Sequence, residues 1–308
     1  MPRNLGTSAP PSTKGGLAVT RSICAELAFA GEAELGEGPV WDPVTRTLIW
    51  LDVLGEKVHR SDPSSGITTT VAVERTVGAV APRAAGGLVA AVAGGCAGLD
   101  DLGRLDMLVH LEEDKPHNRM NDGKCAPDGS FWAGTMDRDG RPGAGTLYRL
   151  APDLQVSVLL TGLTVSNGLG WAPDGTATYF IDTADARIDK LNQSGPDTWS
   201  RTPWVSIDRS LGSPDGLTVD AEGNIWVAMC FGGRVLCYSP AGELRATVEV
   251  PAKVTTSVAF GGDQLDLLFI TTGRTTLSEE EKQSQPRAGS VFVASTSTVG
   301  LPPAVFSG

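Results

Sequence analysis

The chain has 308 residues, 41% of them hydrophobic, and a formal net charge of −11. This acidic balance argues against a nucleic-acid partner, because phosphate binding requires a basic face. No stretch is long and apolar enough to span a membrane, and residues 1–16 lack the apolar run of a signal peptide. We therefore predict a disordered tail over 1–16 and a single domain over 17–308, in a cytoplasmic protein without nucleic-acid or membrane partners.

The cysteines are odd in number and contain no Cys-x-x-Cys pair. This usage indicates buried thiols in a reducing compartment better than it indicates a disulfide framework or a zinc cage. One pairing, Cys230 with Cys237, stays open. The five cysteines are Cys24, Cys96, Cys125, Cys230 and Cys237.

The predicted elements are short β-rich runs separated by turns that contain Pro, Asp and Gly. No window of a dozen residues has a convincing helical pattern, although the polar run 277–282 could form a short helix. Five of the seven tryptophans fall on predicted strands, where we expect them to pack between repeats, and Trp199 and Trp204 fall on a predicted linker. In chain order the clearest strands are 22–27, 39–41, 47–52, 57–60, 169–171, 177–182, 187–191, 217–219, 224–228, 234–238 and 289–294.

A common register repeats along the chain at intervals of 40, 45, 45, 48 and 41 residues. Repeats of this length, each a four-stranded meander, are typical of the blades of a β-propeller. A solenoid has the same period but needs capped ends. We therefore predict an all-β, six-bladed propeller whose ring is closed by the run 22–27, paired with the C-terminal blade that contains 289–294. The six positions in register are Gly38, Gly78, Gly123, Gly168, Gly216 and Ser257.

Three oxygen-bearing side chains directly precede glycines of this register: Glu37, Asn167 and Asp215. Any one of them alone is better explained as a turn former. Three in one register favour a shared site, since equivalent positions of propeller blades converge at the central channel. Two carboxylates and one amide provide hard oxygen donors with a charge of −2, which suit one divalent cation. Three protein ligands leave coordination positions for water and substrate.

These motifs together resemble the family of senescence marker protein/regucalcin, gluconolactonase and luciferin-regenerating enzyme, a group of six-bladed propellers. The resemblance covers roughly residues 22–308. The segments that carry it are 36–41, 118–124, 132–136, 145–148, 166–169, 179–182, 214–217, 232–235 and 255–262.

The resemblance implies that Glu37, Asn167 and Asp215 hold one divalent metal, for which Ca, Zn, Mn and Mg are the alternatives. It implies that Arg119 and Asn121 contact the substrate, with Asn121 near the metal through water.

Two positions depart from the family pattern or match it loosely. Many members have an aromatic residue where this chain has Met120, a change that alters the pocket lining and leaves the metal unaffected. An acidic residue that binds sugar hydroxyls in some members has Asp139 as its closest match here, in a loop that varies.

The chemistry of lactone hydrolysis agrees with these residues, since it needs a polarised carbonyl, a nucleophilic water and a stabilised oxyanion. Asp215 is a candidate general base, and the guanidinium of Arg119 offers donors to a ring or carbonyl oxygen. Asp122, which precedes Gly123 in the same register, could instead orient Arg119. The three histidines have no partner spacing that predicts a catalytic triad.

We therefore predict a gluconolactonase-like enzyme that hydrolyses a small-molecule sugar lactone to the aldonic acid, as a monomer or small homo-oligomer. Two alternatives stay open. One is another hydrolase on the same site, acting on esters, other lactones or organophosphates. The other is a non-enzymatic, calcium-binding propeller, against which stands the pair of Arg119 and Asn121.

Overall fold

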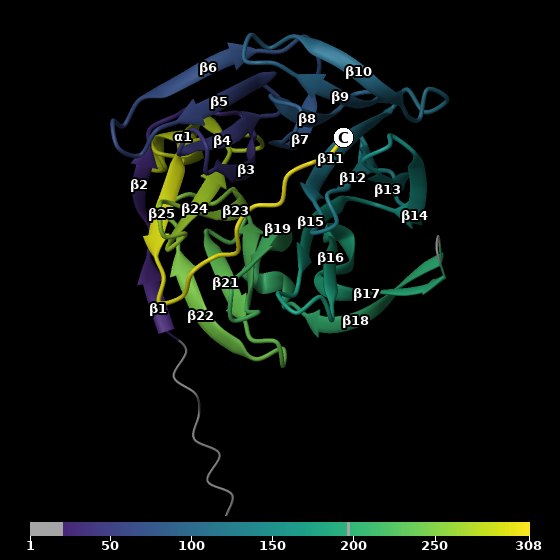
Figure 1. The fold of residues 1–308 in the computed structure, drawn as a ribbon. Coiled ribbons are helices and arrows are strands. Elements are labelled where there is room, and N and C mark those ends of the chain that lie inside the picture. Colours follow the sequence, from purple (N-terminus) through teal and green to yellow (C-terminus); the bar gives the residue numbers. More distant parts are fainter. Residues whose placement is uncertain (1–20, 196–197) are drawn as a thin grey trace, which may run out of the picture.

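The structure, a computed structural model, describes residues 21–195 and 198–308. Its strands form six sheets arranged around a central axis (Figure 1), so the predicted all-β six-bladed propeller is confirmed. The tail predicted over 1–16 lies outside the described residues. Within them the only α-helix is α1 (Glu279–Ser284), close to the run expected to be helical, and a capping box between Ser278 and Glu281 begins it.

Each blade begins with an inner strand beside the axis and continues outward by antiparallel hairpins. Blades 1 to 3 are β3 (Gly36–Asp42), β4 (Thr47–Asp52), β5 (Lys57–Ser61) and β6 (Thr68–Ala72); β7 (Val77–Pro82), β8 (Leu88–Val92), β9 (Gly95–Leu99) and β10 (Leu105–His110); and β11 (Asn118–Cys125), β12 (Phe131–Asp137), β13 (Gly145–Leu150) and β14 (Val156–Leu163). Blades 4 to 6 are β15 (Ser166–Trp171), β16 (Thr178–Asp182), β17 (Arg187–Gly195) and β18 (Thr198–Ser206); β19 (Ser213–Val219), β20 (Ile225–Cys230), β21 (Arg234–Tyr238) and β22 (Leu244–Glu249); and β23 (Thr255–Gly261), β24 (Leu267–Thr272) and β25 (Val291–Ser295). Two short 3-10 helices, η1 (Thr183–Asp185) and η2 (Arg209–Leu211), follow β16 and β18.

The N-terminal run closes the ring in two pieces. Strand β2 (Glu26–Phe29) pairs antiparallel with β25 and completes blade 6, as predicted for the closing strand. Strand β1 (Arg21–Cys24) instead pairs in parallel with β22, as a fifth strand of blade 5. The single closing strand predicted over 22–27 was therefore wrong in its first half. The chain covers the outer edge of blade 5, which would otherwise present unpaired backbone groups, before it crosses to blade 6.

Every inner strand carries a bulge or register shift at the repeated position. In β15 and β19, two residues of the inner strand face one residue of its neighbour, and these pairs are Asn167 with Gly168 and Asp215 with Gly216, each of which includes the one extra residue of the bulge. A bulge of this kind re-aims a side chain and bends the strand. The register read from the sequence is therefore a row of bulges and not a row of turns.

The glycines of this register are required because neighbouring inner strands approach closely. A Cβ atom at Gly168 would lie 2.7 Å from the backbone oxygen of Asp215. A Cβ atom at Gly216 would lie 2.6 Å from the Cβ atom of Ser257. Each glycine therefore lets the next inner strand come close to the functional residue that precedes it.

Hydrophobic side chains fill the spaces between blades. Trp132 of blade 3 makes edge-to-face contacts with Trp171 and Trp199 of blade 4, with ring centroids 5.4 and 5.2 Å apart. Trp199 and Trp204 lie in β18, so their prediction as linker residues was wrong. All five cysteines are free thiols, as predicted, but only Cys96, Cys125 and Cys237 are buried, so the prediction of buried thiols was wrong for the exposed Cys24 and the half-buried Cys230. Among helices of the described residues, none is long and apolar enough to cross a membrane.

Candidate metal and substrate site

The three predicted metal ligands lie on inner strands of blades 1, 4 and 5, beside the central axis (Figure 1). Asp215 lies within hydrogen-bonding reach of the Asn167 side chain, and its carboxylate raises the pKa of Glu37. The structure therefore brings together residues that are separated by up to 178 positions in the sequence. Asn167 and Asp215 are both buried, with 4% and 8% of their surfaces exposed, and Glu37 is half-buried.

Asn167 is held in one orientation with its side-chain oxygen free. Its Nδ2 donates to Thr183 Oγ1 at 3.0 Å, and Thr183 Oγ1 in turn donates to the backbone oxygen of Pro214 at 2.9 Å. Asn167 Oδ1 is fully buried yet accepts no hydrogen bond from the described residues. A buried acceptor without a donor is costly, and a cation would satisfy it.

The carboxylates of this cluster are electrostatically crowded. Burial raises the pKa of Glu37 well above its usual value, and the nearby Asp215 and Asp122 raise it further. Burial also raises the pKa of Asp215 to about 8, again with Asp122 adding to the shift, while Asn167, Cys230 and Arg119 oppose it. The cluster thus resists carrying its full negative charge unless a cation is bound.

This donor set fits a hard divalent cation. Two carboxylates and the unpaired amide oxygen of Asn167 are the ligand types that such ions prefer. In the part of the chain that the structure describes, no three Asp, Glu, His or Cys side chains could hold a metal by themselves. The amide oxygen would therefore be an essential third donor, beside Glu37 and Asp215.

Arg119 and Asn121 form a rigid pair beside the carboxylates. Arg119 Nη1 donates to Asn121 Oδ1 at 2.8 Å and to the backbone oxygen of Met120 at 2.9 Å. Asn121 Nδ2 donates to the backbone oxygen of Ser166 in the next blade at 2.9 Å. The carboxylates of Glu37 and Asp215 both act electrostatically on Arg119. Its Nε and Nη2 groups make no hydrogen bond to a described residue, so these donors are available to a ligand.

Asp122 has a different partner from the one that the sequence suggested. Its Oδ1 accepts from the backbone N–H of Gly123 at 2.7 Å, and the nearby charge is Lys124. Arg119, by contrast, is oriented by Asn121. Lys124 Nζ donates to the backbone oxygen of Leu217 at 2.6 Å. The hypothesis that Asp122 orients Arg119 is therefore not supported, because Asp122 forms an electrostatic pair with Lys124.

Asp139 lies outside this cluster. Its side chain is exposed, and its backbone N–H donates to Asp137 Oδ1 at 2.9 Å in the turn after β12. The neighbouring Arg138 is the loop residue whose charge acts on Arg119. A sugar-binding role for Asp139 stays a prediction.

Sequence reasoning missed four residues that support the site: Thr183, Cys230, Lys124 and Arg138. Cys230 ends β20, and its thiol lies within hydrogen-bonding reach of Asp215. None of the four belongs to the aspartate- or asparagine-glycine pattern that identified the ligands. Of the four, only Lys124 could have been identified from the sequence, because it lies in the same motif as Asn121 and Asp122.

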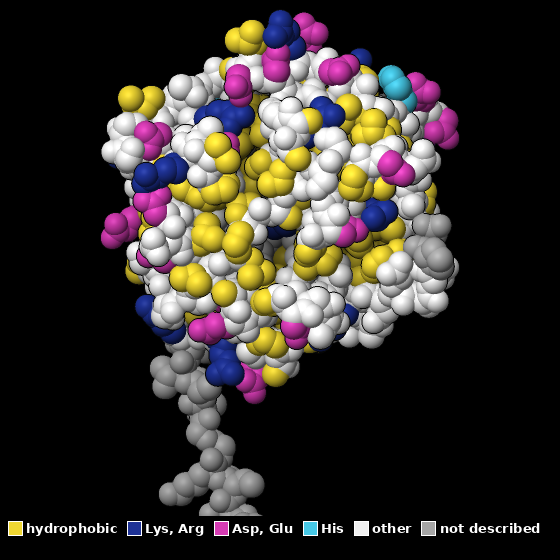
Figure 2. Space-filling model, in the orientation of Figure 1, with side chains coloured by type: hydrophobic (Ala, Val, Ile, Leu, Met, Phe, Trp, Pro, Cys, Tyr) yellow, Lys and Arg dark blue, Asp and Glu magenta, His cyan; other side chains and the backbone are white. Residues whose placement is uncertain are grey.

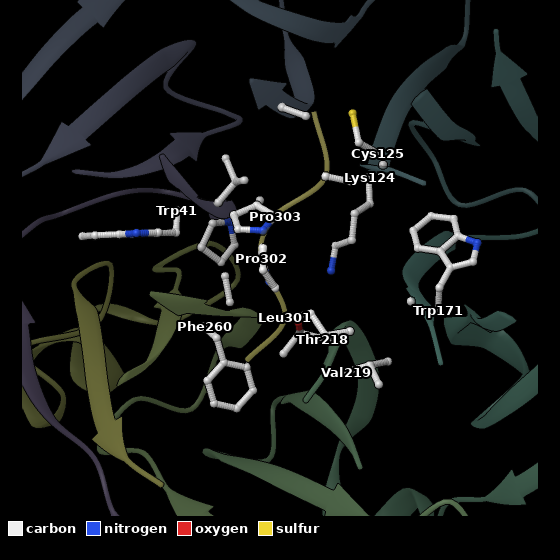
Figure 3. Close-up of a pocket in the computed structure, with 18 of the residues that line it drawn as sticks. Trp41, Lys124, Cys125, Trp171, Thr218, Val219, Phe260, Leu301, Pro302 and Pro303 are labelled. Carbon is white, nitrogen blue, oxygen red and sulfur yellow. The ribbon is translucent and has the colours of Figure 1, made fainter. Parts of the chain in front are cut away.

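A cavity of about 430 Å³ lies at the other end of the channel, where the inner strands end. Figure 3 shows Lys124 extending toward its middle, with Trp41 and Trp171 on opposite sides and the segment 301–303 crossing it. Asp122 and Lys124 line it, whereas Glu37, Asn167 and Asp215 do not. The channel therefore has two compartments with different chemistry, a polar cluster at one end and a largely apolar cavity at the other.

Comparison with known proteins identifies the family. Residues 35–274 match the SMP-30/Gluconolactonase/LRE-like region. The chain belongs to this family. It is similar to regucalcin of Xenopus laevis, with 36% identity over 93% of this chain and 99% of that protein. It is also similar to 6-deoxy-6-sulfogluconolactonase of Pseudomonas putida, with 34% identity over 89% of this chain and 95% of the relative.

Solved structures of SMP-30/Gluconolactonase/LRE-like proteins share the fold. A structure described as a calcium-binding protein, regucalcin, from Agrobacterium tumefaciens superimposes with a TM-score of 0.88 at 30% identity. The match covers 94% of this chain and 99% of that one. The family resemblance inferred from the sequence motifs is confirmed.

Proposed function

We propose that this protein hydrolyses sugar lactones of the gluconolactone type, with one divalent cation held by Glu37, Asn167 and Asp215. The observation that carries the proposal is the buried, unpaired Oδ1 of Asn167 in a cluster with two carboxylates whose pKa values are raised, near the available donors of Arg119. Membership of a family whose relatives include a named sulfogluconolactonase supports a lactone as the substrate.

Each side chain has a distinct role in this reaction. When bound, the cation would polarise the lactone carbonyl and lower the pKa of a water. Asp215 accepts a proton from the attacking water at a carboxylate oxygen, and its closeness to Cys230 and Asn167 holds that oxygen in place. Arg119 directs its free Nε and Nη2 donors at the ring or carbonyl oxygen and stabilises the negative charge that develops there.

Asn121 fixes the position of Arg119 and links it to the next blade. Because Asn121 Oδ1 accepts from Arg119 and Nδ2 donates to Ser166, the guanidinium is held relative to blade 4, which also carries Asn167. Such pre-positioning lowers the reorganisation needed as the substrate reacts. The sugar hydroxyls would extend outward to the loop that contains Arg138 and Asp139.

The test is a hydrolysis assay on chelated protein supplied separately with Ca, Mg, Mn or Zn. Glucono-1,5-lactone should be hydrolysed only after a cation is added, and elemental analysis should find about one ion per chain. Asp215→Asn should lose turnover by about 10²–10⁴-fold even when loaded with metal, as expected for loss of a general base.

Three results would contradict the proposal. Turnover that is indifferent to the chelator would exclude the metal. Faster hydrolysis of p-nitrophenyl acetate or paraoxon than of any lactone would favour the alternative hydrolase on this site. Stoichiometric calcium binding without any hydrolysis would favour the non-enzymatic propeller.

A further inference from the structure

We propose that the cavity at the far end of the channel binds a small apolar carboxylate, with Lys124 as its counter-charge. Its volume of about 430 Å³ falls in the range of small-molecule sites. Its residues come from inner strands of all six blades and from the C-terminal segment, so it is part of the architecture and not a surface irregularity. The inference does not depend on the proposed lactonase activity.

The cavity combines apolar walls with few polar groups. Figure 2 shows hydrophobic side chains gathered around the hollow at the centre of this face. Val80, Val219 and Leu301 belong to its walls, whereas Lys124 is the single cation among its lining residues. Asp122 is the single carboxylate of the lining, and the ammonium group of Lys124 extends into the cavity (Figure 3). A largely apolar pocket with a directed cation selects an amphipathic ligand of negative charge. An aldonic acid is too polar for such walls.

Lys124 has donors to spare on the cavity side. An ammonium group carries three N–H donors, and one of them is directed at the backbone oxygen of Leu217 at 2.6 Å. Asp122 acts on Lys124 electrostatically, but its Oδ1 accepts from the backbone N–H of Gly123, and no direct hydrogen bond or ion pair joins it to the ammonium group among the described residues. A buried ammonium needs such compensation, and a ligand carboxylate would complete it.

The segment that crosses the cavity is fixed at both ends. Gly300 N donates to the backbone oxygen of Leu265 at 2.7 Å, next to blade 6. At the other end Phe306 is fully buried, and it exchanges backbone hydrogen bonds with Pro82 and Ala84 at 2.9 and 2.8 Å. Pro302 and Pro303 between these anchors stiffen the segment (Figure 3). The rim is thus preformed, which lowers the ordering cost of binding.

The experiment uses metal-loaded protein with 4-fluorobenzoate as the probe and fluorine NMR as the readout. A fragment of this size should bind with a Kd on the order of 0.1–1 mM, and the neutral analogue 4-fluorobenzamide should bind at least about tenfold more weakly. Gluconate should not displace the probe, which distinguishes this cavity from the catalytic end. The same binding should persist after chelation.

Two variants locate the probe. Lys124→Met, which removes the charge and keeps most of the side-chain length, should weaken binding at least about tenfold. Thr218→Phe should abolish binding by filling the cavity from β19 without changing a charge, and it covers the case in which Lys124→Met does not fold. Thr202→Phe is the matched control, because Thr202 is exposed on the outer strand β18. Equal binding of the benzamide, displacement by gluconate, or full binding by folded Thr218→Phe would overturn the proposal.

Discussion

Replacing Asp215 by asparagine should stabilise the metal-free protein while it removes activity. Asp215 is 8% exposed, and burial together with Asp122 raises its pKa to about 8. An aspartate in the unfolded chain titrates near 3.9. Between about pH 4 and pH 8 the folded protein therefore keeps a proton that the unfolded chain releases. The free energy of unfolding should be highest below this window and should fall as the pH rises through it.

The size of the effect follows from the same shift. One pKa unit corresponds to about 1.4 kcal/mol, and about four units separate pH 8 from the unfolded value, which gives a ceiling of about 5–6 kcal/mol. Water penetration lowers this ceiling, and the substitution also changes the contacts to Asn167 and Cys230. We expect a gain of about 1–2 kcal/mol for Asp215→Asn at pH 8, which raises Tm by roughly 1–4 °C for a chain of this length.

The assay is thermal unfolding in chelator at pH 5 and pH 8, by calorimetry or dye fluorescence. The wild type should lose more stability than Asp215→Asn between the two pH values, because only the wild type contains Asp215. The variant should still lose some stability, because Glu37, whose pKa is also raised, remains in both proteins. Asp106→Asn, an exposed carboxylate on β10, is the control and should follow the wild type. The reasoning is wrong if Asp215→Asn melts below the wild type at pH 8, or if the two proteins have the same pH dependence.

In a divalent cation at 100 times its Kd, the wild type should gain about 2.7 kcal/mol of unfolding free energy, and Glu37→Gln should lose most of this gain in the same melting assay. Arg119→Ala should retain its metal, as measured by elemental analysis, and should have a higher KM for glucono-1,5-lactone. Its kcat should also fall if the contact with Arg119 strengthens in the transition state. Unchanged kinetics would show that Arg119 does not contact the substrate. A His59, His110, His117 triple alanine variant should keep its turnover once folding is verified, because none of the three interacts with the carboxylate cluster in the described residues. A selective loss of turnover in that variant would instead indicate a histidine base.

The propeller could be predicted from the sequence because each repeat is determined by residues that are close together in the chain. Alternating apolar residues, turn residues and a glycine at a fixed interval determine the strands and their number. The same reasoning located Asn167 and Asp215, since the bulge that directs them requires the glycine that follows each. The residue pairs that resemble turn formers are bulges in the inner strands, which lie close to one another around the axis.

The errors concern contacts between segments that carry no shared pattern. Residues 22–24 have the same alternation whether they pair with blade 5 or blade 6, so the sequence could not assign β1 to β22. Thr183 supports Asn167 from the end of the next strand, and Cys230 reaches Asp215 from β20. Such supporting contacts depend on which side chains face each other across a hairpin, and the spacing of residues in the sequence does not predict these pairs.

The charges along the channel support the proposal of a cation at one end and an anion at the other. Glu37, Asp122 and Asp215 carry three negative charges when ionised, and Arg119 and Lys124 carry two positive charges. Without a metal the channel has an excess of one negative charge, so its carboxylates hold protons. A divalent cation reverses the excess to one positive charge, which then favours the anionic oxygen that forms during hydrolysis. Lys124 lines the cavity at the other end of the channel from the three predicted metal ligands, so carboxylate binding there should be the same with and without the cation, which the chelated sample in the fluorine NMR experiment tests.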